Sequence, residues 1–101
     1  MDTLKNTLTC KLTTPELQKR RATVIAELKK IMIRKEEIQD GWQFTFDGND
    51  DTLEKLLDFI RSERLCCDFF AFHLFVSGEN ATLGITGPDG TKEFLVHEVG
   101  F

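Results

Sequence analysis

The sequence predicts a two-layer α+β domain in which an antiparallel sheet of about four strands, from two hairpins, carries its helices on one face. Two segments place apolar residues at helical spacing, and two pairs of shorter segments alternate apolar and polar residues. Short turns join the members of each pair, so paired strands run antiparallel. The predicted order is helix, hairpin, helix, hairpin, helix (α-ββ-α-ββ-α), with an optional extra strand at the N-terminus.

The composition is that of one folded domain spanning residues 1–101. The chain is 41% hydrophobic and 30% charged, which is the range of globular domains rather than disordered chains. No apolar run approaches the roughly 20 residues that cross a bilayer, and we see no secretion signal. We therefore expect a cytoplasmic protein without membrane contact. Its three cysteines are expected to be reduced thiols there.

The N-terminal third predicts an extended segment followed by a helix. Cys10 alternates with leucines in residues 8–12, so it points the same way as they do in a strand or an extended arm. Thr14 can cap a helix, and Pro15 suits the first helical position. The apolar stripe expected on this helix consists of Leu17, Val24, Ile25, Leu28 and Met32.

A hairpin is predicted next. Residues 33–39 form a charged strand suited to a sheet edge, where Lys35, Glu36 and Glu37 discourage pairing between molecules. Asp40-Gly41 is a strong two-residue turn signal, since both central positions of such a turn need positive φ. The following strand has an aromatic face made of Trp42, Phe44 and Phe46.

A second helix is expected to begin at a capping box of Asp51 and Glu54. Its predicted buried side consists of Leu53, Leu56, Leu57, Ile60 and Arg64, and Cys67 continues that side. Cys66 lies on the neighbouring face, in line with Phe59 and Glu63. If the helix continues through both cysteines, Cys67 faces the core and Cys66 faces its margin.

The remaining third predicts a second hairpin and a short helix. Residues 70–76 and 81–85 alternate as strands around a turn at 77–80, and a helix covers about 91–97. His73 falls opposite the apolar residues of its strand, so we expect it to face solvent. Phe75 falls on the same polar side, which makes it a candidate for a ligand wall or a homodimer contact.

Charge is divided unevenly along the chain. Residues 1–35 carry a net charge of +6 and residues 36–101 carry −10, within a total of −4. The basic part lacks interleaved aromatic residues, so a solvated helix face explains it better than binding of nucleic acid. No nucleophile elbow, glycine-rich phosphate loop or zinc-protease signature is present, so little in the sequence supports an enzyme.

The cysteines carry the main functional hypothesis. The adjacent pair does not match the usual Cys-x-x-Cys pattern of zinc sites. If Cys10 meets Cys66 and Cys67, three thiolates suit a soft metal or metalloid ion, whereas zinc usually takes a fourth ligand or a water. The alternative is that the cysteines fill core positions as small hydrophobic residues. For a ligand or redox role, Cys66 is expected to be the most reactive of the three because it lies nearest the margin. The negative end of the helix dipole raises a thiol pKa there unless Arg61 or Arg64 offsets it.

Several segments together resemble a known group of small bacterial proteins. They are Thr9–Leu12, Glu63–Phe69 with Phe72, Ile85–Pro88 and Lys92–Phe94. The group carries a Cys-Cys-x-Phe signature and is loosely associated with heavy-metal, especially mercury, resistance gene neighbourhoods. The resemblance implies that Cys10, Cys66 and Cys67 act together. Asp68 stands where the group often has Pro or Ala, which adds a carboxylate beside the thiols.

The sequence thus leaves three hypotheses. The first is a protein that binds a thiophilic ion such as Zn, Hg or Cd through Cys10, Cys66 and Cys67. The second is a thiol redox sensor in which Cys10 pairs with Cys66 or Cys67, because adjacent cysteines close a strained ring. The third is a structural or interaction module with buried cysteines, which meets a partner through Phe75 or the basic helix.

Overall fold

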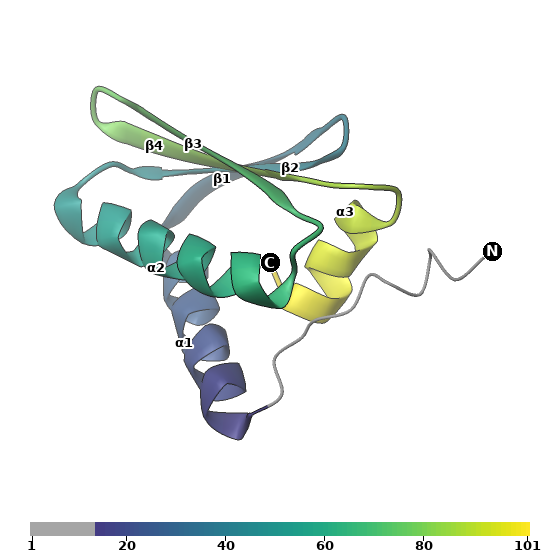
Figure 1. Ribbon diagram of the computed structural model, residues 1–101. Helices are drawn as coiled ribbons and strands as arrows, with labels where there is room; N and C mark the ends of the chain where they lie inside the picture. Colours follow the sequence, from purple (N-terminus) through teal and green to yellow (C-terminus); the bar gives the residue numbers. More distant parts are fainter. Residues whose placement is uncertain (1–13) are drawn as a thin grey trace.

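The computed structural model describes residues 14–101 of the chain, and it confirms the predicted α+β order of elements (Figure 1). Residues 8–12, where an extra strand was predicted, lie outside the described part. A π-helical turn, Leu95–Val99, follows the last α-helix. The elements are α1 (Pro15–Ile31), β1 (Met32–Ile38), β2 (Gly41–Asp47), α2 (Asp50–Cys66), β3 (Ala71–Ser77), β4 (Asn80–Thr86) and α3 (Thr91–Phe94).

The four strands form one antiparallel sheet in the order β1-β2-β4-β3. The strands of each hairpin are neighbours, and β2 and β4 join the two hairpins at the centre. The predicted edge position of the charged strand β1 is confirmed, and β3 forms the other edge. All three α-helices lie on the same side of the sheet, and no helix within residues 14–101 covers its second face (Figure 1).

The core lies between the sheet and the helices. Phe101 enters it from the C-terminal end, with its ring stacked on Phe44 at 4.4 Å and edge-on to Phe59 at 5.2 Å between ring centroids. Such aromatic pairs add to the free energy gained by removing the rings from water. Other side chains of this core with no exposed surface include Leu28, Phe46, Leu56, Ala81, Leu83, Ile85 and Leu95.

Helix α1 begins as the sequence predicts, but its first turn is more exposed than expected. The Thr14 hydroxyl accepts a hydrogen bond from the Leu17 N–H, and Pro15 occupies the first turn. Ile25 and Leu28 are buried, whereas Leu17 is 46% exposed. The start of α1 projects below the other elements, away from the sheet (Figure 1). The predicted apolar stripe is therefore wrong at its first residue, and also at its last, because Met32 begins strand β1.

The first hairpin forms, but its turn differs from the prediction. Ile38 pairs with Gly41, so Gln39 and Asp40 are the two turn residues. Neither Asp40 nor Gly41 has a positive φ, so the predicted Asp-Gly turn is wrong. Gly41 instead lies in β2, where a Cβ would overlap the backbone carbonyl of Ile85. The glycine is required there by close approach of two strands rather than by turn geometry.

Helix α2 starts earlier than predicted and is rotated relative to the expected stripe. The Asn49 side chain caps it by accepting a hydrogen bond of 2.9 Å from the Thr52 N–H, so the predicted capping box is wrong. Leu57 is 48% exposed and Arg64 is also exposed. The residues that α2 buries are Thr52, Leu56, Phe59, Glu63 and Cys66. Because α1 packs beside α2, the face of α2 that carries Phe59 and Cys66 is the one that is buried.

The last third of the chain follows the prediction closely. Gly78, with φ of 59°, turns β3 into β4, and α3 with its π-helical turn covers the predicted final helix. His73 is exposed, as predicted. Within residues 14–101, every helix is too short or too polar to span a lipid bilayer.

Candidate metal and thiol site

The two adjacent cysteines lie where α2 ends. Cys66 is the last helical residue, and Cys67 leaves the helix with φ of −125° while its N–H donates to the Glu63 carbonyl at 2.6 Å. This change of direction turns the Cys67 side chain inward, so both cysteines are buried, Cys66 at 1% exposed and Cys67 at 0%. The prediction that Cys66 faces the margin is therefore wrong.

The sulfurs form a compact group with a carboxylate. Cys67 Sγ lies 3.5 Å from Cys66 Sγ, and one oxygen of Glu63 joins them in a group whose atoms all lie within 4.8 Å of one another. Cys67 is a free thiol, whereas Cys66 is disulfide-bonded. The expectation that all three cysteines are reduced thiols is therefore wrong for Cys66.

A buried ion pair supports this group from α1. Arg21 donates from Nε to Glu63 Oε2 at 2.6 Å and from Nη2 to Glu63 Oε1 at 3.1 Å. The Glu63 side chain is completely buried, and that of Arg21 is 13% exposed. Arg21 Nη2 also lies 3.9 Å from Cys67 Sγ. One guanidinium therefore contacts both the carboxylate and a thiol sulfur.

The surroundings of Cys67 favour its protonated form. Burial is the largest cause that raises the pKa of this thiol, to about 12, because a thiolate loses its hydration there. The negative charge of Glu63 raises it further, and Arg21 opposes the rise. The negative charge of Asp68 has a smaller effect and also raises this pKa. Cys67 is therefore a neutral thiol at physiological pH.

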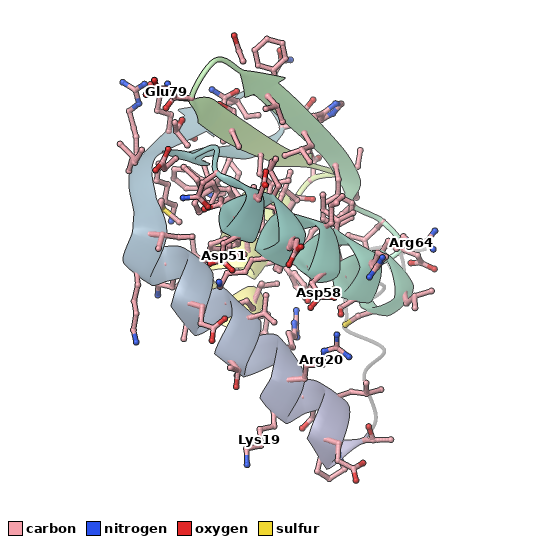
Figure 2. The ribbon with its side chains drawn as sticks, turned by 90° about the vertical axis from the view of Figure 1, so that its left-hand side faces the viewer. Lys19, Arg20, Asp51, Asp58, Arg64 and Glu79 are labelled. Atoms are coloured by element: carbon pink, nitrogen blue, oxygen red, sulfur yellow. The ribbon has the colours of Figure 1, made fainter. Side chains whose placement is uncertain are left out.

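A surface pocket reaches Cys66 from the groove between α1 and α2. It has a volume of about 480 Å³. Arg20 and Asp58 face one another across this groove, and each Asp58 oxygen accepts a hydrogen bond of 3.2 Å from Arg20 Nη2 (Figure 2). The pocket therefore borders the sulfur group at Cys66. Its lining residues are Leu17, Arg20, Asp58, Arg61, Ser62, Leu65 and Cys66.

Of the sequence-predicted site residues, the structure brings together Cys66 and Cys67, while Cys10 lies outside the described residues. His73 and His97 are exposed and do not belong to the sulfur group. The sequence reasoning did not assign roles to Glu63 or Arg21. A sequence feature at each residue could have pointed to this role. Glu63 falls three residues before Cys66, so the two lie on the same helix face, and Arg21 interrupts the apolar stripe of α1.

Comparison of the chain with protein-family models, with curated proteins and with solved structures finds no match. The fold and the site therefore define its class by themselves. It is an α+β protein with a buried Glu-Cys-Cys group that could hold a metal ion.

Proposed function

We propose that the protein binds a soft, thiophilic metal ion, with Cys66 and Cys67 as ligands and Cys10 as the third sulfur. Zn(II), Cd(II) and Hg(II) are the ions that such donors suit. The observation that carries the proposal is the distance of 3.5 Å between the two buried sulfurs. Adjacent cysteines on one helix would otherwise diverge by about 100°.

The sulfur spacing also favours one coordination geometry. Two sulfurs at about 2.3 Å from a tetrahedral ion lie about 3.8 Å apart, which is close to the spacing observed. In a linear two-sulfur arrangement at the same bond length they would lie about 4.6 Å apart. The pair therefore suits a bent site that is completed by a third donor, and Cys10 is the sulfur that the sequence offers.

Glu63 and Arg21 prepare the site for a cation. The Cys67 thiol is hydrogen-bonded to the Glu63 carboxylate, so this carboxylate can receive the proton that the thiol must lose. Arg21 balances the charge of Glu63 and keeps its oxygens fixed. We therefore assign Glu63 as the hydrogen-bond acceptor that orients the Cys67 thiol. Glu63 becomes a further oxygen ligand of the ion when one of its two hydrogen bonds from Arg21 breaks.

Reduction of Cys66 is a condition of the proposal, because a disulfide sulfur is a poor ligand compared with a thiolate. Reduction adds two electrons and two protons to the disulfide and yields two thiols. A small thiol in the cytoplasm supplies them, which is why we place the function in that compartment. The resemblance to proteins from heavy-metal resistance neighbourhoods agrees with this proposal and remains a hypothesis.

The proposal is tested by titrating the fully reduced protein with Cd(II) under argon and following the thiolate-to-cadmium charge-transfer absorption. Wild type is expected to bind one equivalent. Cys66→Ser, Cys67→Ser and Cys10→Ser are each expected to weaken binding, and a variant lacking all three cysteines is expected to bind none. His73→Ala is the matched control and should bind like wild type. Equal uptake by wild type and the variant without cysteines would overturn the proposal.

A second candidate function is thiol redox sensing, which the disulfide at Cys66 favours. In this proposal Cys10 and Cys66 give up two protons and two electrons to a peroxide, which forms the S–S bond and two molecules of water. Cys67 remains a thiol because burial keeps it protonated. Mass spectrometry of the reduced protein after mild peroxide treatment is expected to show loss of two hydrogens and a peptide that links residues 10 and 66. Thiols that remain unmodified would contradict this function.

A further inference from the structure

The two edges of the sheet differ in their chemistry. Strand β1 carries Arg34, Lys35, Glu36 and Glu37 in succession, and its register with β2 shifts between Met32 and Arg34. Charged side chains and an irregular register are the usual means by which an edge strand avoids pairing with another chain. Edge β1 is therefore closed to a partner strand.

Charged side chains also cover the core beneath β1. The Lys35 ammonium lies 4.4 Å from the ring centroid of Trp42 and donates to the Phe101 carbonyl at 3.1 Å. Glu37 forms an ion pair of 2.7 Å with Lys92. These polar groups separate the aromatic core from solvent along this edge.

Edge β3 has none of these features. Its residues, Ala71–Ser77, include no Lys, Arg, Asp, Glu or Pro, and its register with β4 is unbroken. On the core side Phe72 and Leu74 are only half-buried, and Val76 is 48% exposed. On the opposite face Phe75 is 67% exposed. Apolar side chains therefore continue from the core to the surface along this edge.

The layer beneath β3 extends this apolar edge. Phe59 of α2 meets Phe72 edge-on, with ring centroids 6.4 Å apart, so α2 lies under β3. Leu53 and Ile60, on the side of α2 turned away from Asp58 and α1, are only half-buried. No strand within residues 14–101 pairs with the free side of β3.

The backbone of β3 is also arranged to accept a partner. A two-residue turn makes Ser77 and Asn80 the closing pair of the hairpin, and antiparallel residues direct their N–H and C=O groups alternately to either side. It follows that Phe72, Leu74 and Val76 direct their backbone groups toward the open side. These same residues carry the half-covered apolar side chains.

We infer that two copies of the chain pair through β3, antiparallel, about a two-fold axis at Leu74. The two four-stranded sheets then form one continuous eight-stranded sheet. Leu74 lies opposite its own copy, and Phe72 lies opposite Val76 of the second copy. On the other face His73 lies opposite Phe75.

The sequence of β3 suits this register. Every cross-strand pair on the core side is apolar, and no like charges meet across the axis. A two-fold contact uses the same patch on both copies, so it closes at two chains. Pairing β3 with β1 of another copy would instead place charged residues opposite apolar ones and would leave edges for further addition.

The pairing is tested by sedimentation equilibrium of the whole chain, with and without a phosphine reductant so that intermolecular disulfides are recognised. Wild type is expected to have twice the 11.6 kDa of one chain in both conditions. Val76→Lys puts a charge on the β3 edge and should raise the dimer Kd by at least about tenfold. Ile33→Lys is the matched control on β1, where residue 33 is 61% exposed, and it should leave the dimer unchanged.

Circular dichroism verifies that both variants are folded, and amide hydrogen exchange gives a second measurement. In the dimer the amides of Phe72, Leu74 and Val76 should be protected, and dilution or Val76→Lys should remove that protection. A monomer at all concentrations would overturn the inference. So would a dimer that Ile33→Lys disrupts and Val76→Lys does not. Protection of Leu74 in a monomer would show that the chain's own N-terminal segment covers β3, which also overturns it.

Discussion

Arg21 of α1 holds the Glu63 carboxylate of α2 through two hydrogen bonds, of 2.6 Å and 3.1 Å. The two residues are 42 positions apart in the chain, and Glu63 has no exposure to water. The pair joins the two long helices beside the cysteine sulfurs. A charge buried in this way depends on its partner, because the Arg21 guanidinium supplies the counter-charge that replaces the hydration of the carboxylate.

Loss of this partner is expected to destabilise the fold strongly. Arg21→Ala should lower the free energy of unfolding by about 3–5 kcal/mol, measured by urea denaturation at pH 7, because it leaves Glu63 buried without a counter-charge. Arg20→Ala is the matched control on the same helix. Its pair with Asp58 is 60% and 36% exposed, so the loss should be below about 1 kcal/mol. Equal losses in the two variants would contradict the prediction.

Cys67 should make stability depend on alkaline pH. Burial and Glu63 raise the pKa of this thiol from 9.0 to about 12 in the folded chain. Between these values the unfolded chain has lost the proton and the folded chain has kept it. The free energy of unfolding should therefore fall as pH rises through this window, and Cys67 should contribute no change below it.

The measurement for Cys67 is urea denaturation of wild type and Cys67→Ala at pH 8, 9, 10 and 11. The difference in unfolding free energy between the two should narrow as pH rises, because only wild type carries the thiol. Both proteins carry the same lysines and neither has a tyrosine. The contribution of lysine titration to the unfolding free energy therefore cancels in the difference. A difference that stays constant across the series would refute a raised pKa.

The Asn49 side chain caps helix α2, so its removal is expected to destabilise the start of this helix. Asn49→Ala should cost about 1 kcal/mol in unfolding free energy, because the Thr52 N–H loses its acceptor. Glu54→Ala removes the partner of the capping box that the sequence predicts, and should change stability by less than about 0.5 kcal/mol. Thermal unfolding of both variants checks the assignment. A larger loss of stability for Glu54→Ala than for Asn49→Ala would indicate that Asp51, and not Asn49, caps the helix.

Phe101 is expected to be a major core residue. Its side chain is 4% exposed and packs on two other rings, so Phe101→Ala should lower the free energy of unfolding by about 3–5 kcal/mol. Leu65→Ala is the control for a large apolar residue at the surface, because Leu65 is 70% exposed. It should change stability by no more than about 0.5 kcal/mol. Similar losses in both would contradict the packing described for Phe101.

Local signals in the sequence predict most of the fold. The alternation of β2 and β4, the Thr14 cap and the turn at Gly78 each depend on neighbouring residues, and each is found in the structure. The orientation of α2 was predicted wrongly because it depends on α1, which packs on one side of it. An apolar periodicity shows that a helix has a buried side. It does not decide whether the face with Leu57 or the face with Phe59 is buried, because that depends on where the neighbouring helix packs.

The site could be predicted only in part for the same reason. Helix spacing alone brings Glu63 near Cys66, since three residues make almost one turn. The contact with Arg21 comes from packing of two helices, which no local pattern contains. The meeting of Cys10 with the other two sulfurs stays a prediction, since residues 14–101 do not include it.

The close approach at Gly41 has a consequence for any attempt to diversify this chain. A side chain at this position would collide with the Ile85 carbonyl, whereas a Cβ at Gly84 would have ordinary room beside His73 at 3.6 Å. A library randomised at both codons and selected for folding should therefore return glycine at the first and a mixture of small residues at the second.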